Sequence, residues 1–311
     1  MPEPTSADPV LIVGSVALDT LETPYGRAEE ALGGSAVYAS LACSLFAPVR
    51  LVGVVGGDYP QAGYDLLRSR PIDLRGLEVV ASGRTFRWAG RYGGDLGSAE
   101  TLATELNVFA DFSPQLPPEY VGTPYVFLAN IQPQLQAQVL DQVGAPRFSM
   151  CDTMNLWLDS ALDQVIAMMR RVDVALMNDA EVRRLTGAPH LVAAAEQTLA
   201  LGARRTLVKK GEHGALLCTR DGCRFVPPYP TTRIHDTTGA GDSFAGGMIG
   251  YLAATGDLGE DNLVRAAAIG AVCASFAVED LGVASLTTAT RAAVEERYSL
   301  LEKSSRMPSL M

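Results

Sequence analysis

The alternation of short apolar runs with helical patterns constrains the fold of this chain more than any other feature of its sequence. Near-continuous apolar runs, typical of strands buried on both faces of a parallel sheet, occur at six places. They are Val10–Val13, Arg50–Val55, Tyr125–Ala129, Phe148–Asp152, Val172–Met177 and Thr206–Lys209. Because helical patterns separate them, the sequence predicts an α/β fold with a doubly wound, mostly parallel sheet flanked by helices.

Helical patterns fill the segments between these strands and most of the chain after residue 242. The earlier ones are Ser35–Phe46, Gln61–Ser69, Pro133–Val143, Leu158–Arg170, Asp179–Leu185 and Leu191–Leu201. A strand-like run at Tyr229–His235 precedes three more helices, at Ser243–Ala254, Asn262–Val278 and Thr288–Lys303. No repeat or linker interrupts the pattern, so residues 1–311 are expected to form a single domain.

Two segments depart from the alternation and are expected to form a small lid. Leu18–Arg27 and Thr85–Phe112, or about residues 16–28 and 84–112, combine turn residues, alternating polarity and many aromatic side chains. This pattern predicts a small antiparallel sheet that projects from the strand ends. Such a sheet can cover a substrate, and its apolar face can also pair two protomers into a homodimer. The two roles are compatible.

The charge of the chain limits its partners. A formal charge of −10 and a pI near 4.8 argue against nucleic acid or an anionic membrane surface as the main partner. A nucleotide remains compatible, because backbone N–H groups, lysines and Mg²⁺ bind its phosphates locally.

The cysteines and the N-terminus predict a cytoplasmic protein. The five cysteines are Cys43, Cys151, Cys218, Cys223 and Cys273. They are scattered and include no C-x-x-C pair, so they are expected to be core residues in a reducing compartment rather than a disulfide framework or zinc site. Residues 1–9 do not resemble a signal peptide, and the apolar run 266–278 is too short to span a bilayer.

The run from Thr237 to Phe244 predicts an anion-binding turn. Its small residues lead into the start of a helix, whose unpaired N–H groups and positive dipole end suit a phosphate group. Asp242 places a carboxylate at the edge of this turn. It either accepts a proton from an attacking hydroxyl or offsets the helix dipole, and the segment alone leaves both open. No P-loop is present, and the turn lacks the third glycine of a dinucleotide-binding fingerprint.

Together these features resemble the ribokinase/PfkB family of small-molecule kinases, over nearly the whole chain. The seven-residue run that begins at Asp236 is similar to the late signature of that family. The resemblance implies that Asp242 is the catalytic base for the substrate hydroxyl. It also implies that the N–H groups of Gly239, Ala240 and Gly241 form the anion hole for the transferring phosphoryl group.

Three further matches support the resemblance. Gly33-Gly34 resembles the motif that lets substrate hydroxyls approach the backbone, although glycine pairs are also common in loops. Asp19 is similar to the acceptor of substrate hydroxyls in the family, or else it is a turn residue. Asn178 and Glu181 resemble the N-x-x-E motif linked to phosphate and, through water, to Mg²⁺. The alternative is that they form a helix capping box.

The segment from Thr206 to Gly214 resembles the nucleotide side of the family. Lys209 or Lys210 is expected to neutralise ATP phosphates, beside a turn that contains Gly211 and Gly214. One of the two lysines is expected to face solvent.

Two other parts of the resemblance concern the adenine and a cation. The stretch that contains Ala271 and Ser275 matches the helix lining the adenine pocket, where small residues leave room for the base; tight helix packing is the alternative. Asp236 and Thr238 match a monovalent-cation site, for example for K⁺, found in many relatives.

The acceptor side departs from the family pattern. Sugar kinases usually carry Asn a few residues after the glycine pair, where this chain has Tyr38, so Tyr38 is a candidate substrate contact. Asp152 and Asn155 follow a strand and are expected to face the cleft. Arg87 and Trp88 alternate on the lid. An inward Arg87 would favour a charged substrate, whereas an inward Phe86 or Trp88 would favour stacking on a sugar or nucleobase.

The sequence therefore predicts an ATP- and Mg²⁺-dependent phosphotransferase that acts on a hydroxyl of a small sugar or sugar-like alcohol. A nucleoside kinase on the same scaffold is the nearest alternative. A non-catalytic protein that senses sugars or nucleotides is a more distant one, and a dehydrogenase is the most distant.

Overall fold

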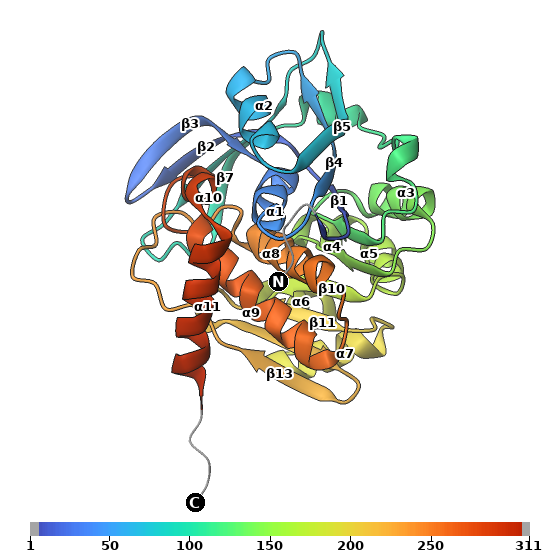
Figure 1. The fold of residues 1–311 in the computed structure, drawn as a ribbon, viewed down its shortest axis with the longest axis vertical. Coiled ribbons are helices and arrows are strands. Elements are labelled where there is room, and N and C mark those ends of the chain that lie inside the picture. The colour runs from blue at the N-terminus through green and yellow to red at the C-terminus, as the bar shows by residue number, and fades with distance from the viewer. Residues whose placement is uncertain (1–5, 307–311) are drawn as a thin grey trace, which may run out of the picture.

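The computed structural model describes residues 6–306 and contains a nine-stranded sheet in the order β13-β12-β11-β10-β9-β8-β1-β4-β5 (Figure 1). Its strands are β1 Val10–Val13, β4 Val49–Gly56, β5 Ile72–Val80, β8 Tyr125–Leu128, β9 Phe148–Cys151, β10 Val174–Asn178, β11 Thr206–Lys209, β12 Ala215–Thr219 and β13 Gly222–Val226. Neighbours are parallel from β11 to β5, and β12 and β13 add an antiparallel hairpin at one edge. The predicted doubly wound, mostly parallel sheet is confirmed.

Helices bury both faces of this sheet. Along β1, Val10 and Ile12 belong to one hydrophobic cluster, whereas Leu11 and Val13 belong to the other, because side chains alternate along a strand. The first cluster includes residues of α1 Ser35–Cys43, α2 Gln61–Arg68, α8 Ala240–Thr255, α9 Glu260–Ala277, α10 Ala284–Thr288 and α11 Arg291–Ser305. The second includes α3 Pro133–Val143, α4 Asn155–Ser160, α5 Leu162–Met169, α6 Asp179–Thr186 and α7 Leu191–Ala200. Within residues 6–306, no helix combines the length and apolar character needed to cross a membrane.

The predicted lid is a separate four-stranded sheet in the order β3-β2-β6-β7. Its strands are β2 Ala17–Thr23, β3 Gly26–Gly33, β6 Phe86–Tyr92 and β7 Ala99–Glu105. The pairs β2–β3 and β6–β7 are antiparallel, as predicted, whereas the central pair β2–β6 is parallel. The short 3-10 helix η2, Asn107–Asp111, follows the lid, and η3, Pro118–Tyr120, leads back toward the large sheet.

Helix α8 packs closely against α1 and α9, as seen near the centre of Figure 1. A Cβ at Gly246 would collide with the carbonyl of Ala39 on α1, and a Cβ at Gly247 would lie 2.5 Å from Cys273 Sγ on α9. Because any side chain larger than hydrogen would push these helices apart, the glycines determine where the N-terminus of α8 lies.

Several predicted boundaries are wrong. Segment 158–170 is divided between α4 and α5, because Ala161 between them has φ −147° and ψ 36° and cannot continue a helix. Residues 229–235 form no strand, since Pro230 removes a backbone donor that a strand pair would use. Helix α8 begins at Ala240 rather than Ser243, and α11 begins only after Thr290, whose side chain accepts a hydrogen bond from the Ala293 N–H.

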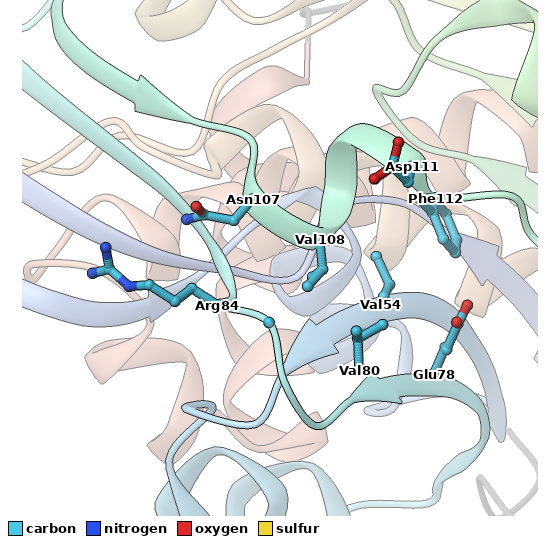
Figure 2. A pocket seen from close by; sticks show the side chains of 9 residues that line it. Val54, Glu78, Val80, Arg84, Asn107, Val108, Asp111 and Phe112 are labelled. Carbon is cyan, nitrogen blue, oxygen red and sulfur yellow. The ribbon is translucent and has the colours of Figure 1, made fainter.

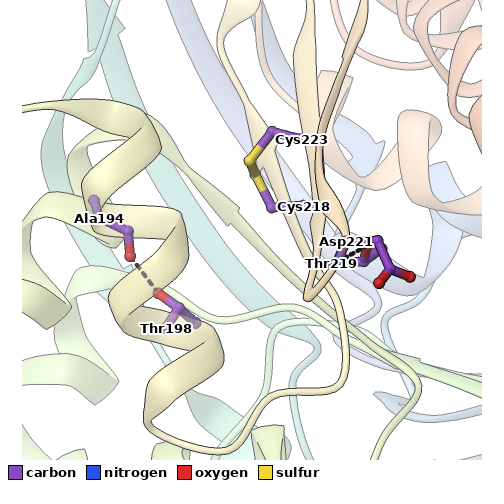
Figure 3. The surroundings of a disulfide bond; sticks show 6 residues. All are labelled: Ala194, Thr198, Cys218, Thr219, Asp221 and Cys223. Atoms are coloured by element: carbon purple, nitrogen blue, oxygen red, sulfur yellow. Dashed lines mark hydrogen bonds between the residues drawn. A yellow bond between two sulfur atoms is a disulfide. The ribbon is translucent and has the colours of Figure 1, made fainter.

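The prediction that all cysteines are isolated core residues is also wrong. Cys218 and Cys223 form a disulfide bond across the β12–β13 hairpin (Figure 3). The hairpin places them directly opposite each other in the strand register, with Cα atoms 4.1 Å apart. The sequence analysis did not identify this pair because it predicted no hairpin in this part of the chain. The other three, Cys43, Cys151 and Cys273, are buried free thiols as expected.

Candidate active site

The predicted anion-binding turn lies at the N-terminus of α8. Gly239 precedes the first helical residue with φ 70° and ψ 2°, a left-handed conformation that favours glycine. A Cβ at Gly239 would also collide with the ring of Tyr38. Because α8 begins at Ala240, Gly241 and Asp242 lie in its first turn, at the positive end of the helix dipole.

A single lysine lies among carboxyl groups beside this turn. Lys209 Nζ forms an ion pair with Asp152 Oδ2 at 2.5 Å and lies 3.0 Å from the place that a Cβ on Gly241 would occupy. Burial lowers the pKa of Lys209, but the negative charges of Asp152, Glu181 and Asp242 outweigh that effect and raise the pKa overall. The ammonium group therefore stays charged at neutral pH.

Two of the neighbouring carboxyl groups titrate near neutrality. Burial, followed by the charge of Asp152, raises the pKa of Asp242 to about 7, while Lys209 opposes the rise. Burial and Asp152 likewise raise the pKa of Glu181 to about 7. A carboxyl group with a pKa near the working pH is suited to accept a proton.

Asn178 and Glu181 form the capping box that was the alternative to a direct phosphate or metal role. Asn178 Oδ1 accepts from the Glu181 N–H at 2.8 Å, and Glu181 Oε2 accepts from the Asn178 N–H at 2.7 Å. The Asn178 side chain is thus occupied by α6. Glu181 nevertheless lies close enough to Asp152 and Lys209 for their charges to affect its pKa.

Asp19 on β2 lies against the predicted Gly33-Gly34 pair. A Cβ at Gly33 would collide with the Asp19 carboxylate, and Gly34 has φ 93°. Burial raises the pKa of Asp19 to about 7; the Gly34 N–H opposes this rise, and the charges of Asp236 and Asp242 add to it. The structure therefore brings Asp19 and the signature turn into one site.

The lid directs Trp88, and not Arg87, toward the side of Asp19. Asp19 and Trp88 are register partners on β2 and β6, so their side chains share a face of the small sheet. The Trp88 ring covers Gly90, where a Cβ would collide with it. Arg87 forms ion pairs with Glu30 at 2.9 Å and Asp58 at 2.8 Å. Of the two alternatives, the register therefore supports Trp88 as the residue on the Asp19 face, with Arg87 on the opposite face.

Tyr38 does not line an open cleft as predicted. It is 1% exposed, with its ring beneath Gly239, because α1 packs under α8. Its hydroxyl has no hydrogen-bond partner among residues 6–306. The sequence position after the glycine pair indicated a substrate contact, but helix packing turns this side chain into the core.

The Asp236 side chain stabilises the turn by accepting hydrogen bonds from two backbone N–H groups. Its Oδ1 accepts from the Thr238 N–H at 2.8 Å, and its Oδ2 accepts from the Gly282 N–H at 2.9 Å. Both oxygens of this fully buried side chain are therefore already hydrogen-bonded. In the described part of the chain, no group of three or more His, Cys, Asp or Glu residues is arranged to hold a metal ion.

Some of the residues predicted to bind the nucleotide lie near Asp242, and others point away from it. Gly211 and Gly214 belong to a tight turn around η4, Gly211–His213, closed by the Lys210 N–H and the Gly214 carbonyl at 2.8 Å. The Lys210 side chain turns outward over the ring of Phe225, so Lys209 is the lysine that faces the site.

On α9, Ala271 is half-buried, whereas the Ser275 hydroxyl is engaged within the protein. Ser275 Oγ accepts from Arg297 Nη1 of α11 at 2.8 Å. The role of this stretch beside an adenine stays a prediction. Asn155, the first residue of α4, is exposed and follows the β9 end that carries Asp152.

Sequence reasoning missed two lid residues that touch the signature turn. The Tyr92 hydroxyl lies 2.8 Å from Thr238 Oγ1, and Thr237 Oγ1 donates to the Leu96 carbonyl at 2.8 Å. These pairs are 146 and 141 residues apart, so no local pattern could have indicated them.

A groove of about 430 Å³ lies apart from this site, between η2 and the strands β4 and β5 (Figure 2). Figure 2 shows Val54, Val80 and Val108 pointing toward one another in it, with Arg84 and Glu78 at its margins. None of the predicted site residues lines it. The charged side chains predicted to act in catalysis and binding, Asp19, Asp152, Lys209 and Asp242, therefore lie outside this groove.

Comparisons with known proteins agree with this geometry. Residues 10–290 match the profile of the family described as pfkB family carbohydrate kinase. The chain is 28% identical to a cytidine kinase of Thermococcus kodakarensis over 249 residues, which cover 78% of this chain and 88% of that protein.

Two solved structures share the fold. A Burkholderia thailandensis nucleoside kinase in complex with inosine aligns with a TM-score of 0.77 and 19% identity, over 94% of this chain and 97% of that one. A fructokinase from Vibrio cholerae O395 with bound fructose, ADP and calcium aligns with a TM-score of 0.77 and 20% identity, over 94% and 99%.

The raised pKa of Asp19 makes folding stability depend on pH. Because the pKa is about 7 in the folded protein and near 3.8 ordinarily, the stability that protonation of Asp19 contributes is present below pH 4 and lost as the pH rises toward 7. We expect Asp19→Asn, which stays neutral, to be more stable than wild type at pH 8 by up to about 4 kcal/mol and equal to it near pH 4. Thermal melting at both pH values measures this. Asp221→Asn, at an exposed turn, is the control; an Asp19→Asn advantage that is the same at both pH values would contradict the expectation.

Proposed function

Because this chain belongs to the pfkB family of carbohydrate kinases, we propose that it transfers the γ-phosphate of ATP to a hydroxyl group of a small sugar or nucleoside. The family resemblance and the ribokinase-like fold are confirmed by the profile match and the structural neighbours. The observation that carries the proposal for this chain is the meeting of Asp242 and Lys209 at the N-terminus of α8.

In the proposed reaction, Asp242 accepts the proton of the acceptor hydroxyl as that oxygen attacks the γ-phosphorus. Its pKa of about 7 allows it to be ionised before the reaction and protonated after it. The N–H groups of Gly239 and Gly241 stabilise the negative charge of the phosphoryl group, and Lys209 adds a fixed positive charge. The Ala240 N–H, the third predicted donor, donates to the Thr237 carbonyl at 3.3 Å and would share its hydrogen between the two acceptors. The bond to the β-phosphate oxygen breaks, and ADP leaves with that oxygen.

Mg²⁺ would bind on the Asp152 and Glu181 side of Lys209. Carboxylate oxygens are the ligands that Mg²⁺ prefers, and a cation would offset the burial and the charge of Asp152 that raise the pKa of Glu181. When bound, the metal would neutralise phosphate charge, with Glu181 acting through water. The Gly211–Gly214 turn and Ala271 would contact the nucleotide. Activation by K⁺ near Asp236 and Thr238 stays a prediction.

The acceptor would lie between Asp19, the Gly33-Gly34 backbone and the Trp88 ring. The ion pairs of Arg87 leave it no free charge for an anionic acceptor, and Trp88 offers a flat apolar face instead. This arrangement supports an uncharged sugar or a nucleoside over a sugar acid. The Trp88 face is the specific reason to keep nucleosides beside sugars as candidates.

Removing the proposed base tests the reaction. Asp242→Asn keeps the size and the hydrogen-bonding ability of the side chain but cannot accept the proton, so turnover should fall by about 10²–10⁴-fold. A coupled assay for ADP release with the best acceptor measures it, and Asp221→Asn again serves as the matched control. Near-wild-type turnover by Asp242→Asn would exclude Asp242 as the base.

A substrate screen tests the acceptor class. Among ribose, fructose, sugar acids and nucleosides, we expect an uncharged sugar or a nucleoside to be phosphorylated fastest. Trp88→Ala should then raise KM for that acceptor by about 5- to 100-fold and leave KM for ATP nearly unchanged. Arg91→Ala, on the outer face of the same strand, is the control. A preference for sugar acids would contradict the proposed acceptor site, and no turnover of any acceptor would favour a sensing protein.

We also propose that the protein works in the cytoplasm. We further propose that two copies of the chain form a homodimer through their lid sheets. The edge strand β7 is exposed, and Leu102 on it is 41% exposed. Light scattering should give twice the protomer mass of 32.9 kDa for wild type and the single mass for Leu102→Asp. A wild-type chain with the single mass at assay concentration would rule out the homodimer.

A further inference from the structure

The lid holds both threonines of the signature turn. Thr238 Oγ1 and the Tyr92 hydroxyl are 2.8 Å apart, and Thr237 Oγ1 donates to the Leu96 carbonyl at 2.8 Å. Tyr92 is the last residue of β6, and Leu96 lies in the connection from β6 to β7. The residues that precede the proposed anion hole are therefore bonded to a different sheet from the one that carries Lys209.

Leu96 is held tightly at this contact. It is 5% exposed although it lies in a surface connection, and its φ of 51° is uncommon for a residue with a branched side chain. Such a conformation persists only where several contacts determine it together. Burial of the side chain and the hydrogen bond to its carbonyl are two such contacts.

The other supports of the turn come from the core and do not involve the lid. The Tyr38 ring lies beneath Gly239, and Asp236 binds the Thr238 N–H. The lid adds the contacts to the two side-chain hydroxyls. It also carries Trp88 on the same strand as Tyr92, four residues earlier.

We propose that Tyr92 and Leu96 position the Gly239–Gly241 turn for phosphoryl transfer when the lid is closed. This inference rests on the proposed kinase function. Trp88 would contact the acceptor, and Tyr92 would contact the Gly239–Gly241 turn. Because both residues lie on β6, binding of the acceptor would also bring the N–H groups of the turn into position. Tyr92 is a positioning residue in this account, because it acts on phosphate through Thr238.

Removing the Tyr92 hydroxyl is the central test. Tyr92→Phe keeps the ring and loses the bond to Thr238, so we expect kcat to fall by about 10- to 100-fold. KM for the acceptor should change by less than about threefold, because Trp88 and Asp19 are unaffected. The melting temperature should stay close to that of wild type. Tyr25→Phe, on the exposed β2–β3 turn of the same sheet, is the matched control.

A double-mutant cycle separates positioning from a general loss of structure. If Tyr92 acts through Thr238, Thr238→Val should lower kcat in a similar way, and the double variant should be no worse than the poorer single variant. Thr238→Ser, which keeps the hydroxyl, should retain most of the activity. Additive losses in the double variant would overturn the proposed route through Thr238.

Amide hydrogen exchange tests the contact between the lid and the turn without requiring kinase activity, so it can fail or succeed independently of the proposed function. In wild type, the amides of residues 93–97 should be protected, and Tyr92→Phe should remove that protection whether or not an acceptor is known. If wild type transfers no phosphate, the proposed function fails and exchange alone decides whether the lid contact exists. Unchanged exchange, or an active Tyr92→Phe with wild-type kcat, would overturn the inference.

Discussion

The close packing of α8 between α1 and α9 is the constraint on which the site depends. Gly246 and Gly247 let α8 approach both neighbours, so the N-terminus of α8 rests on the Tyr38 ring. That contact sets where Asp242 lies relative to Lys209 at the end of β11. The placement of the charged groups therefore follows from contacts between uncharged atoms, because a densely packed core tolerates little displacement.

The carboxyl groups near the N-terminus of α8 influence the pKa values of one another. Lys209 is one positive charge beside Asp152, Glu181 and Asp242, and burial opposes ionisation of Glu181 and Asp242. The result is a pKa near 7 for Asp242 and Glu181 rather than the usual value near 4. A site of this kind can exchange a proton at neutral pH, and it would gain from a cation that arrives with a nucleotide. The lid adds Trp88, which lies opposite Asp19 on the neighbouring strand of the small sheet and is proposed to contact the acceptor.

Much of the site could be predicted because its residues follow strands in an alternating chain. Asp152 follows a predicted strand and was expected to face the cleft, and Lys209 ends another and was a candidate for the nucleotide phosphates. Prediction failed where a side chain's direction depended on packing. Tyr38 turned into the core. The sequence left open which of the two lysines faces solvent, and the packing of Lys210 over Phe225 decided it. The Cys218–Cys223 bond was missed because the short β12–β13 hairpin was not recognised.

The sequence by itself determined that buried strands alternate with helices, and it determined the turn before α8 and the identity of its carboxylate, because these depend on local periodicity and on residues adjacent in the chain. Only the tertiary structure decided which lysine faces the site, that Trp88 rather than Arg87 faces Asp19, and that Tyr92 and Leu96 reach the turn. These outcomes depend on contacts between residues far apart in sequence, and local patterns carry no information about such contacts.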